Sequence, residues 1–462
     1  MVRLEKDTLG EVKVPDNVYY GPQTARAVEN FRVSGERLPA SFIRAQAAIK
    51  TASARANMQS GRLDQKIGEA IVQAATEIRG GKFDKQFVVD AFQSGAGTSQ
   101  NMNANEVIAN RALEIMGYGK GRYDIIHPND HVNMSQSSND TTHTAIHISA
   151  MESLKKDLLP VVIELNELLL NRAAEFMEIV KPGRTHLQDA VPITLGQEFS
   201  GYARTVELGV ERLFRAMNDL EELNMGGTAV GTGLNTPTGF GAIAIKEMNS
   251  LTGIDFRLAE NAFEATQGAD AILNTSAALR NLAASLIKIA NDLRLLSSGP
   301  RASLGEIKLP AVQPGSSIMP GKVNPVMAEM LNMACFQVIG NDTAIMMAAQ
   351  AGQLELNVFT PVLAYNLLKS IHILSGAIDS FNRNCLNGIT ANRERCAKLA
   401  ESSLAIATSL APEIGYEKAA EVSYRAHREN RTIREIVDEM GILTEEEKQE
   451  LLDPMKLTGV KK

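Results

Sequence analysis

Long helical segments occupy the middle of the chain and constrain its fold more than any other feature. Apolar residues recur there at helical spacing, and several segments exceed the roughly 8–20 residues that are usual for a globular helix. Within 261–296, Ala, Leu and Ile occur on more than one helical face, which is typical of a helix that is buried on all sides. The sequence therefore predicts a mainly α fold with a long central helical bundle that forms an oligomer. The expected helical segments are 141–180 with a kink at Pro160, 195–223, 259–297, 325–350 and 356–385.

The charge and the cysteine content exclude several classes of protein. The chain of 462 residues has a formal net charge of −7 and no run of Lys and Arg, so it lacks the basic face of a nucleic-acid-binding protein. Its three cysteines form no CxxC pair, which argues against a disulfide framework and a structural zinc site. The apolar stretches are too short for a membrane span, and the charged N-terminus has no signal-peptide core. We therefore expect a cytoplasmic protein that binds neither membranes nor nucleic acid.

Changes of pattern along the chain predict three domains. Residues 1–134 mix short extended segments, loops and helices, and are expected to form a mostly helical N-terminal domain. Residues 135–391 contain the long helices of the central bundle. Residues 392–462 form shorter, more charged helices, with capping boxes at Thr432-x-x-Glu435 and Thr444-x-x-Glu447. This last part is expected to be a small helical C-terminal domain.

The segment GSSIMPGKVNP (315–325) is the most informative candidate site. It is a poor phosphate-binding P-loop, because five residues separate Gly315 from Gly321 and Val323 replaces the Ser or Thr that would hold magnesium. As a loop it carries two hydroxyls, an ammonium and an amide, and Asn324-Pro325 resembles the start of a helix. A helix N-terminus beside a lysine binds carboxylates well. The alternative is an ordinary connecting loop.

Two further polar segments have the same character. SQSSND (135–140) places hydroxyls and amides just before a helix, which suits an anion, although a plain N-cap explains it too. GRTHLQDA (183–190) lies between two long helices and holds an imidazole among polar neighbours. His143 and His147 have the spacing of a metal-binding pair, but no third ligand is evident, so no metal site is expected. Gly231-Thr232-Gly233 lacks the third glycine of a dinucleotide fingerprint.

Together the three segments resemble those of the fumarase/aspartase superfamily, and within it the class II fumarases most. The similarity extends nearly from end to end, from RLEKDTLGEV (3–12) to NRERCAKLAESS (392–403) and IGYEKAAE (414–421). The resemblance implies a three-domain, almost all-α subunit whose central helices form a tetramer with a twenty-helix core. It also implies active sites that draw their segments from three subunits, and no cofactor and no metal.

The resemblance implies a role for each matching residue. Ser316 resembles the base that removes the proton beside a carboxylate, and His186, paired with Glu329, resembles the group that handles the leaving hydroxyl. A second, non-catalytic dicarboxylate site is implied around His127, Asn129 and Asp130, although Asp124 stands where a basic residue would help. The residues that resemble ligands of the substrate carboxylates are Thr98, Ser137, Ser138, Asn139, Thr185, Ser317, Lys322 and Asn324.

The expected reaction is the reversible hydration of fumarate to L-malate, and two alternatives stay open. Ser138, the segment 357–361 and the segment 282–292 are fumarase-like, whereas the segments 95–99 and 19–21 look like those of aspartate ammonia-lyases. A structural protein that has lost catalysis is the other alternative. Such a protein has no need of the catalytic set, which is present in full here.

Overall fold

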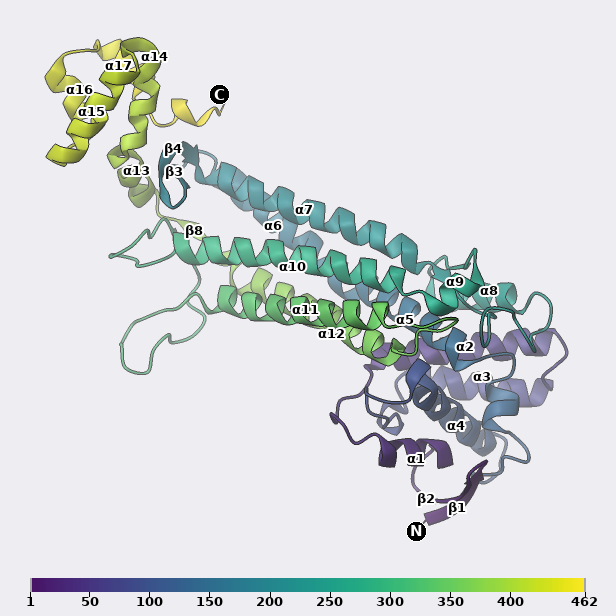
Figure 1. The fold of residues 1–462 in the computed structure, drawn as a ribbon. Helices are drawn as coiled ribbons and strands as arrows, with labels where there is room; N and C mark the ends of the chain where they lie inside the picture. The colour runs from purple at the N-terminus through teal and green to yellow at the C-terminus, as the bar shows by residue number, and fades with distance from the viewer. Residues whose placement is uncertain (1, 461–462) are drawn as a thin grey trace. The chain divides into compact units, whose positions relative to one another are not determined.

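The computed structural model describes residues 2–460, and within them the fold is mainly α-helical, as predicted (Figure 1). The described residues form seventeen α-helices and four two-stranded sheets. None of these helices combines the length and the hydropathy needed to cross a membrane. The chain divides into two compact units, each made of three separate stretches. The boundaries predicted at 134 and 391 stay a prediction.

The first unit comprises the residues up to 160, 211–283 and 336–375. Its centre is α2, which contacts α3, α5 and α8 and is buried along most of its length. Helix α3 follows the N-cap Asp64 and ends at Arg79, with Gly80 as its C-cap. The elements that belong to this unit are β1 (Val2–Asp7), β2 (Gly10–Pro15), α1 (Pro22–Asn30), α2 (Ala40–Gln59), α3 (Gln65–Arg79), α4 (Thr98–Ile115), α5 (Ser138–Ser153), β5 (Glu222–Leu223), α8 (Phe240–Thr252), β6 (Arg257–Leu258) and α9 (Ala262–Gln267).

The second unit comprises 161–210, 284–335 and the residues from 376 onward. Its C-terminal helices bury a small apolar cluster of their own, which includes Leu410, Val422 and Ile436. The two predicted capping boxes, at Thr432 and Thr444, are confirmed. The elements of this unit are β3 (Val180–Thr185), β4 (Gln188–Thr194), β7 (Ile307–Lys308), β8 (Thr390–Ala391), α13 (Arg393–Ser402), α14 (Ala411–Ile414), α15 (Tyr416–Glu429), α16 (Ile433–Met440) and α17 (Glu445–Leu451).

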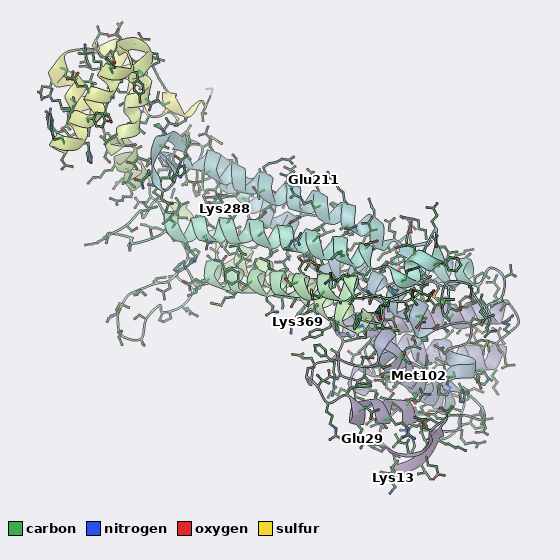
Figure 2. All side chains as sticks on the ribbon, viewed as in Figure 1. Lys13, Glu29, Met102, Glu211, Lys288 and Lys369 are labelled. Atoms are coloured by element: carbon green, nitrogen blue, oxygen red, sulfur yellow. The ribbon has the colours of Figure 1, made fainter. Side chains whose placement is uncertain are left out.

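Five long helices have residues in both units. They are α6 (Leu159–Glu175), α7 (Leu195–Leu220), α10 (Asp270–Leu296), α11 (Val326–Gln350) and α12 (Thr360–Asn384). Polar pairs join them within each unit. In the first, Ser276 of α10 donates to Asp342 of α11 over 2.6 Å. In the second, the Tyr202 hydroxyl of α7 donates to Asp292 of α10, and Lys288, labelled in Figure 2, lies 4.8 Å from the Tyr202 ring centroid.

The long helices lie where the sequence predicts them, with different bounds. The segment predicted to be helical to 180 ends its helix at Glu175 and Val180 begins β3, and the last long helix begins at Thr360 instead of 356. A π-helical turn, Leu154–Leu158, separates α5 from α6 just before Pro160, where a kink is predicted. The segment predicted to be helical from 259 begins its long helix only at Asp270, because Asn261 caps the short helix α9 and Gly268 follows its end. Local cap chemistry therefore overrides the apolar periodicity there.

The buried imidazole of His143 on α5 makes stability depend on pH. His143 is 3% exposed and its Nε2 has no hydrogen-bond partner among the described residues. Burial, followed by the nearby His147, lowers the pKa of His143 to about 4. Above pH about 6.5 both the folded and the unfolded chain leave it neutral; as the pH falls from about 6.5 to about 4, only the unfolded chain takes up the proton.

We therefore expect acid to destabilise the fold through His143, by up to about 3 kcal/mol at pH 4. The His143→Phe variant should lose less of its thermal stability between pH 7 and pH 5 than the unchanged protein. Thermal unfolding at the two pH values measures this, with His427→Asn, at an exposed position of α15, as the control. An equal loss in all three proteins would contradict the account.

Candidate functional site

Two long helices of the first unit begin side by side at a pair of hydroxyl groups. Thr98 is the first residue of α4 and Ser138 is the first residue of α5, and their Oγ atoms lie 3.1 Å apart. Ser137 caps α5 by accepting from Asn139 N–H, whereas α4 has no side chain on its N-cap Gly97 to do the same. The positive ends of two helix dipoles therefore meet at one place, which favours an anion.

A glycine-rich loop, 226–233, supports this pair of helix ends; it contains Gly231-Thr232-Gly233, which is not a dinucleotide fingerprint. Asn139 donates from Nδ2 to the carbonyl oxygen of Ala229 over 2.8 Å. The buried Asp140 carboxylate accepts from the backbone N–H groups of Gly226 and Thr228, as well as from Ser137. The signal that could have found this loop is its four glycines within 226–233, since Thr228 and three of these glycines have positive φ.

A buried lysine holds the SQSSND segment and the residues just before it by hydrogen bonds. Lys50 of α2 is 1% exposed and donates to Asn133 Oδ1 and Gln136 Oε1, each over 2.9 Å. Burial lowers the pKa of Lys50 to about 7, and the charge of the nearby Asp140 opposes that shift. Burial likewise raises the pKa of Asp140 to about 6, against three amide donors and Lys50. These contacts span more than eighty residues of sequence, so no local pattern reveals them.

The segment GRTHLQDA forms the tip of the β3–β4 hairpin, which the sequence did not predict. Thr185 pairs with Gln188, leaving His186 and Leu187 as the two turn residues. Both have positive φ, 54° and 60°, where Asn or Gly is usual. Leu187 is 72% exposed, so no apolar contact explains the strain. Non-glycine residues held in this backbone region are concentrated at functional sites.

The loop 315–325 connects the end of β7 to α11 and is closed at its neck. Gly315 N–H donates to Lys322 O over 2.9 Å, and Asn324 Nδ2 donates to Gly315 O over 2.6 Å. Inside the loop, Ser316 Oγ accepts from the N–H groups of Ile318 and Met319, over 3.2 and 2.9 Å. Asn324 thus closes the loop with its amide nitrogen. The connection between α10 and α11 extends away from both helices in Figure 1.

The structure brings the expected site residues together in three groups. Thr98, Ser137, Ser138 and Asn139 lie at the helix ends of the first unit. In the second unit, Thr185 and His186 lie on the hairpin. Ser316, Ser317, Lys322, Asn324 and Glu329 lie on the loop or in the first turn of α11. Within residues 2–460 no hydrogen bond joins His186 to Glu329, so their pairing stays a prediction.

The side chain of His127, the histidine of the expected second site, already accepts hydrogen bonds from backbone N–H groups that follow it in the chain. His127 Nδ1 accepts from the N–H groups of Asn129 and Asp130, each over 3.2 Å, and caps the turn Pro128–Val132. Asp124 is held by Arg122 in a two-bonded ion pair. Dicarboxylate binding at His127, Asn129 and Asp130 therefore stays a prediction.

Comparisons with known proteins identify the family of the chain. The family model described as "Lyase" matches residues 10–340, and the one described as "Fumarase C C-terminus" matches residues 406–459. The aspartate ammonia-lyase of Bacillus subtilis is 51% identical over 456 residues, which cover 99% of this chain and 96% of that protein. The class II fumarate hydratase of Thermosynechococcus vestitus is 50% identical over 445 residues, 96% and 95% of the two chains.

The chain belongs to the fumarase/aspartase superfamily of lyases. The crystal structure of a class II fumarase from Schistosoma mansoni matches the fold with a TM-score of 0.96 at 39% identity, covering 99% of both chains. Aspartases and fumarases thus match at nearly equal identity, and the overall comparison separates lyases from other enzymes without choosing between the two reactions.

The one charged residue of the loop 315–325 is Lys322. Lys322 is exposed and takes part in no ion pair within the described chain. The same part of the chain holds no group of three or more His, Cys, Asp or Glu side chains placed to hold a metal ion. The three groups of expected site residues offer hydroxyls, amides, an ammonium and helix N-termini.

The loop neck gives a direct prediction for lyase activity. A Cβ at Gly315 would lie 2.4 Å from Lys322 O and 2.9 Å from Asn324 N, both backbone atoms that the neck holds in place. Gly315→Ala should therefore open the neck and lower turnover by about tenfold or more, while the melting temperature stays nearly unchanged because the loop is exposed. The matched control is Gly119→Ala, where a Cβ meets nothing within 4 Å. Equal turnover in both variants would contradict this role of the neck.

Proposed function

We propose that this lyase is a fumarate hydratase, which adds water reversibly to fumarate to form L-malate. The observation that carries the proposal is the Ser316 hydroxyl, which accepts two backbone hydrogen bonds inside a closed loop. A serine hydroxyl is normally far too weak an acid to serve as a base. Hydrogen bonds to its charged form favour that form, and two amide donors aimed at Oγ supply them.

Charge that develops at the substrate needs donors already in place. Removing the proton beside a carboxylate creates an aci-carboxylate with two negative charges on one group. Lys322 and Asn324 follow Ser316 on the same loop, and α11 begins directly after it. Preorganised donors of this kind are usually the largest single contribution to such catalysis.

The second carboxylate of the substrate fits the helix ends of the first unit. Thr98 and Ser138 offer two hydroxyls 3.1 Å apart at the N-termini of α4 and α5. In the proposal, Ser137 and Asn139 complete this seat and Thr185 and Ser317 contribute from the other two groups. His186, oriented by Glu329, handles the leaving hydroxyl through water.

We propose that the protein assembles as a homotetramer and that each active site combines segments from three subunits. The support is that most of the expected ligands are exposed or half-exposed in the single chain, although they are polar and lie on short rigid elements. The long helices that carry them have several buried faces and also expose large apolar side chains, such as Met333, Phe336 and Met347 of α11. Exposed apolar residues on a bundle helix indicate an interface between subunits. The cytoplasmic location stays a prediction.

The alternative function is an aspartate ammonia-lyase, which the 51% identity to the Bacillus subtilis enzyme favours. The two conflicting sequence signals lie in direct contact. Ala96 N–H, in the aspartase-like segment, donates to Val358 O, in the fumarase-like segment, over 2.8 Å. The fumarase-like segment 357–361 thus supports the aspartase-like segment 95–99. We therefore give more weight to the segment 357–361 and to Ser138, which contacts Thr98.

The test offers L-malate and L-aspartate to the purified protein in separate cuvettes and follows the ultraviolet absorbance of the conjugated double bond. The proposal expects absorbance to rise with malate alone. A rise with aspartate alone would make the protein an aspartase. No rise with either would favour a lyase scaffold without this chemistry.

Ser316→Ala should abolish turnover, because Ser316 is the proposed base and its Oγ is the atom that the two backbone N–H groups stabilise in its charged form. The loss should be at least about 1000-fold, and size-exclusion chromatography should find the same assembly as for the unchanged protein. Ser409→Ala, a hydroxyl of the C-terminal helices that donates to backbone carbonyls, is the control. Near-normal activity of Ser316→Ala would remove Ser316 from the role of base.

His186→Asn should slow hydration by about 100-fold or more, since general acid–base groups contribute roughly 10²–10⁴-fold. Asn tolerates the positive φ of this turn position better than most residues, so the hairpin should keep its shape. Steady-state kinetics with malate measure the effect. An unchanged kcat would show that His186 takes no part in the reaction.

A further inference from the structure

A buried ion-pair cluster lies at the base of the hairpin that presents His186. Arg184 of β3 donates from Nη2 to Glu306 Oε1 over 2.8 Å and from Nη1 to Oε2 over 3.1 Å. Lys181, also of β3, lies 3.5 Å from Glu306 Oε2 and 3.0 Å from Glu198 Oε2. Two positive and two negative charges are thus balanced, and Glu306 is completely buried. The cluster anchors the β3 strand at two positions.

The backbone of Glu306 is itself fixed on three sides. Its N–H donates to Leu296 O, at the end of α10, over 2.9 Å. Its carbonyl oxygen accepts from Asn392 N–H over 2.8 Å and from the Cys396 thiol. The next residue, Ile307, begins β7, which pairs with β8. Glu306 is therefore a rigid point, and ten residues after it the chain reaches Ser316.

On the β3 side the hairpin is held by the ion-pair cluster and by its contacts with α13. Residues 185–189 are exposed, and none of their side chains makes a hydrogen bond within the described chain. On the other strand, β4 contacts the turn Leu404–Leu410. Two consecutive non-glycine residues with positive φ persist only where the surrounding structure over-determines them. Arg184 is the last anchored side chain before that strained turn.

We propose that Arg184 and Glu306 are positioning residues for catalysis: their two-bonded ion pair fixes the hairpin so that His186 is held in its working orientation. The same carboxylate lies at the start of the segment that leads to Ser316, so one buried group sets the position of both catalytic segments of a subunit. This inference rests on the proposed function. The guanidinium is required because a planar fork fixes orientation, whereas an ammonium supplies only charge.

The experiment compares Arg184→Lys with Arg111→Lys. Arg111 makes a similar two-bonded pair with Glu77, and its side chain is 18% exposed against 14% for Arg184. For Arg184→Lys we expect kcat for malate to fall about tenfold to 100-fold, with KM changed less than about twofold and the melting temperature within a few degrees. Backbone amide exchange in the peptide 183–190 should become about tenfold faster. Arg111→Lys should leave kcat and this exchange unchanged.

A second variant keeps the test informative if Arg184→Lys folds poorly. Glu306→Asp retains the charge but withdraws the carboxylate by one methylene, and should give the same fall in kcat and the same faster exchange. A lower melting temperature with unchanged kcat would mean a purely structural role and would overturn the proposal, as would unchanged kcat and exchange in Arg184→Lys.

Activity and amide exchange test the proposed function and the role of the ion pair separately. If the unchanged protein hydrates no fumarate, the proposed function falls, and the exchange measurement alone decides on the ion pair. Faster exchange at 183–190 in both variants would then support the anchoring of the hairpin, and unchanged exchange would overturn it. If the unchanged protein is active and the variants match it in kcat and exchange, only the positioning proposal falls.

Discussion

The N-termini of long buried helices are the constraint on which the rest of this structure depends. An unpaired polar group in the interior of a buried helix costs roughly 2–7 kcal/mol, whereas the end of a helix offers backbone N–H groups that no other residue of the helix pairs. Here the first residues of α4 and α5 place two hydroxyls 3.1 Å apart, and the Ser316 loop leads directly into α11. Each of these ends carries a partial positive charge from the helix dipole. In the proposed function, each of these ends contributes to binding the carboxylates of a small dicarboxylate.

Rigid attachment of these ends is the second requirement, and both units meet it with buried charges. In the first unit, Lys50 and Asp140 hold the SQSSND segment through Gln136 and the backbone of the glycine-rich loop. In the second, Glu306 holds the hairpin through Arg184. Buried charges contribute little net stability compared with apolar residues of the same volume. The role of these buried charges is better explained by the positions of the SQSSND segment and the hairpin, which they hold.

The sequence predicted those features whose causes are local. Ser137 and Asp140 form a capping box, and a cap depends on four consecutive residues. The loop at Ser316 is likewise bounded by its own Gly and Pro residues. The hairpin at His186 was missed because its turn has neither Asn nor Gly. His186 and Leu187 both have positive φ, a conformation that contacts with residues distant in sequence must hold in place. Lys50 and Glu306 were missed for the same reason, since each finds its partners more than eighty residues away.

Association of subunits is the central claim that a single chain leaves to experiment. The most direct measurement is complementation between two inactive variants, Ser316→Ala and His186→Asn, refolded together and compared with each refolded alone. If one active site takes Ser316 and His186 from different subunits, mixed tetramers contain some sites with both residues intact, and malate turnover should reappear. Native mass spectrometry would verify that mixed tetramers had formed. Mixed tetramers as inactive as the separate variants would contradict the shared site.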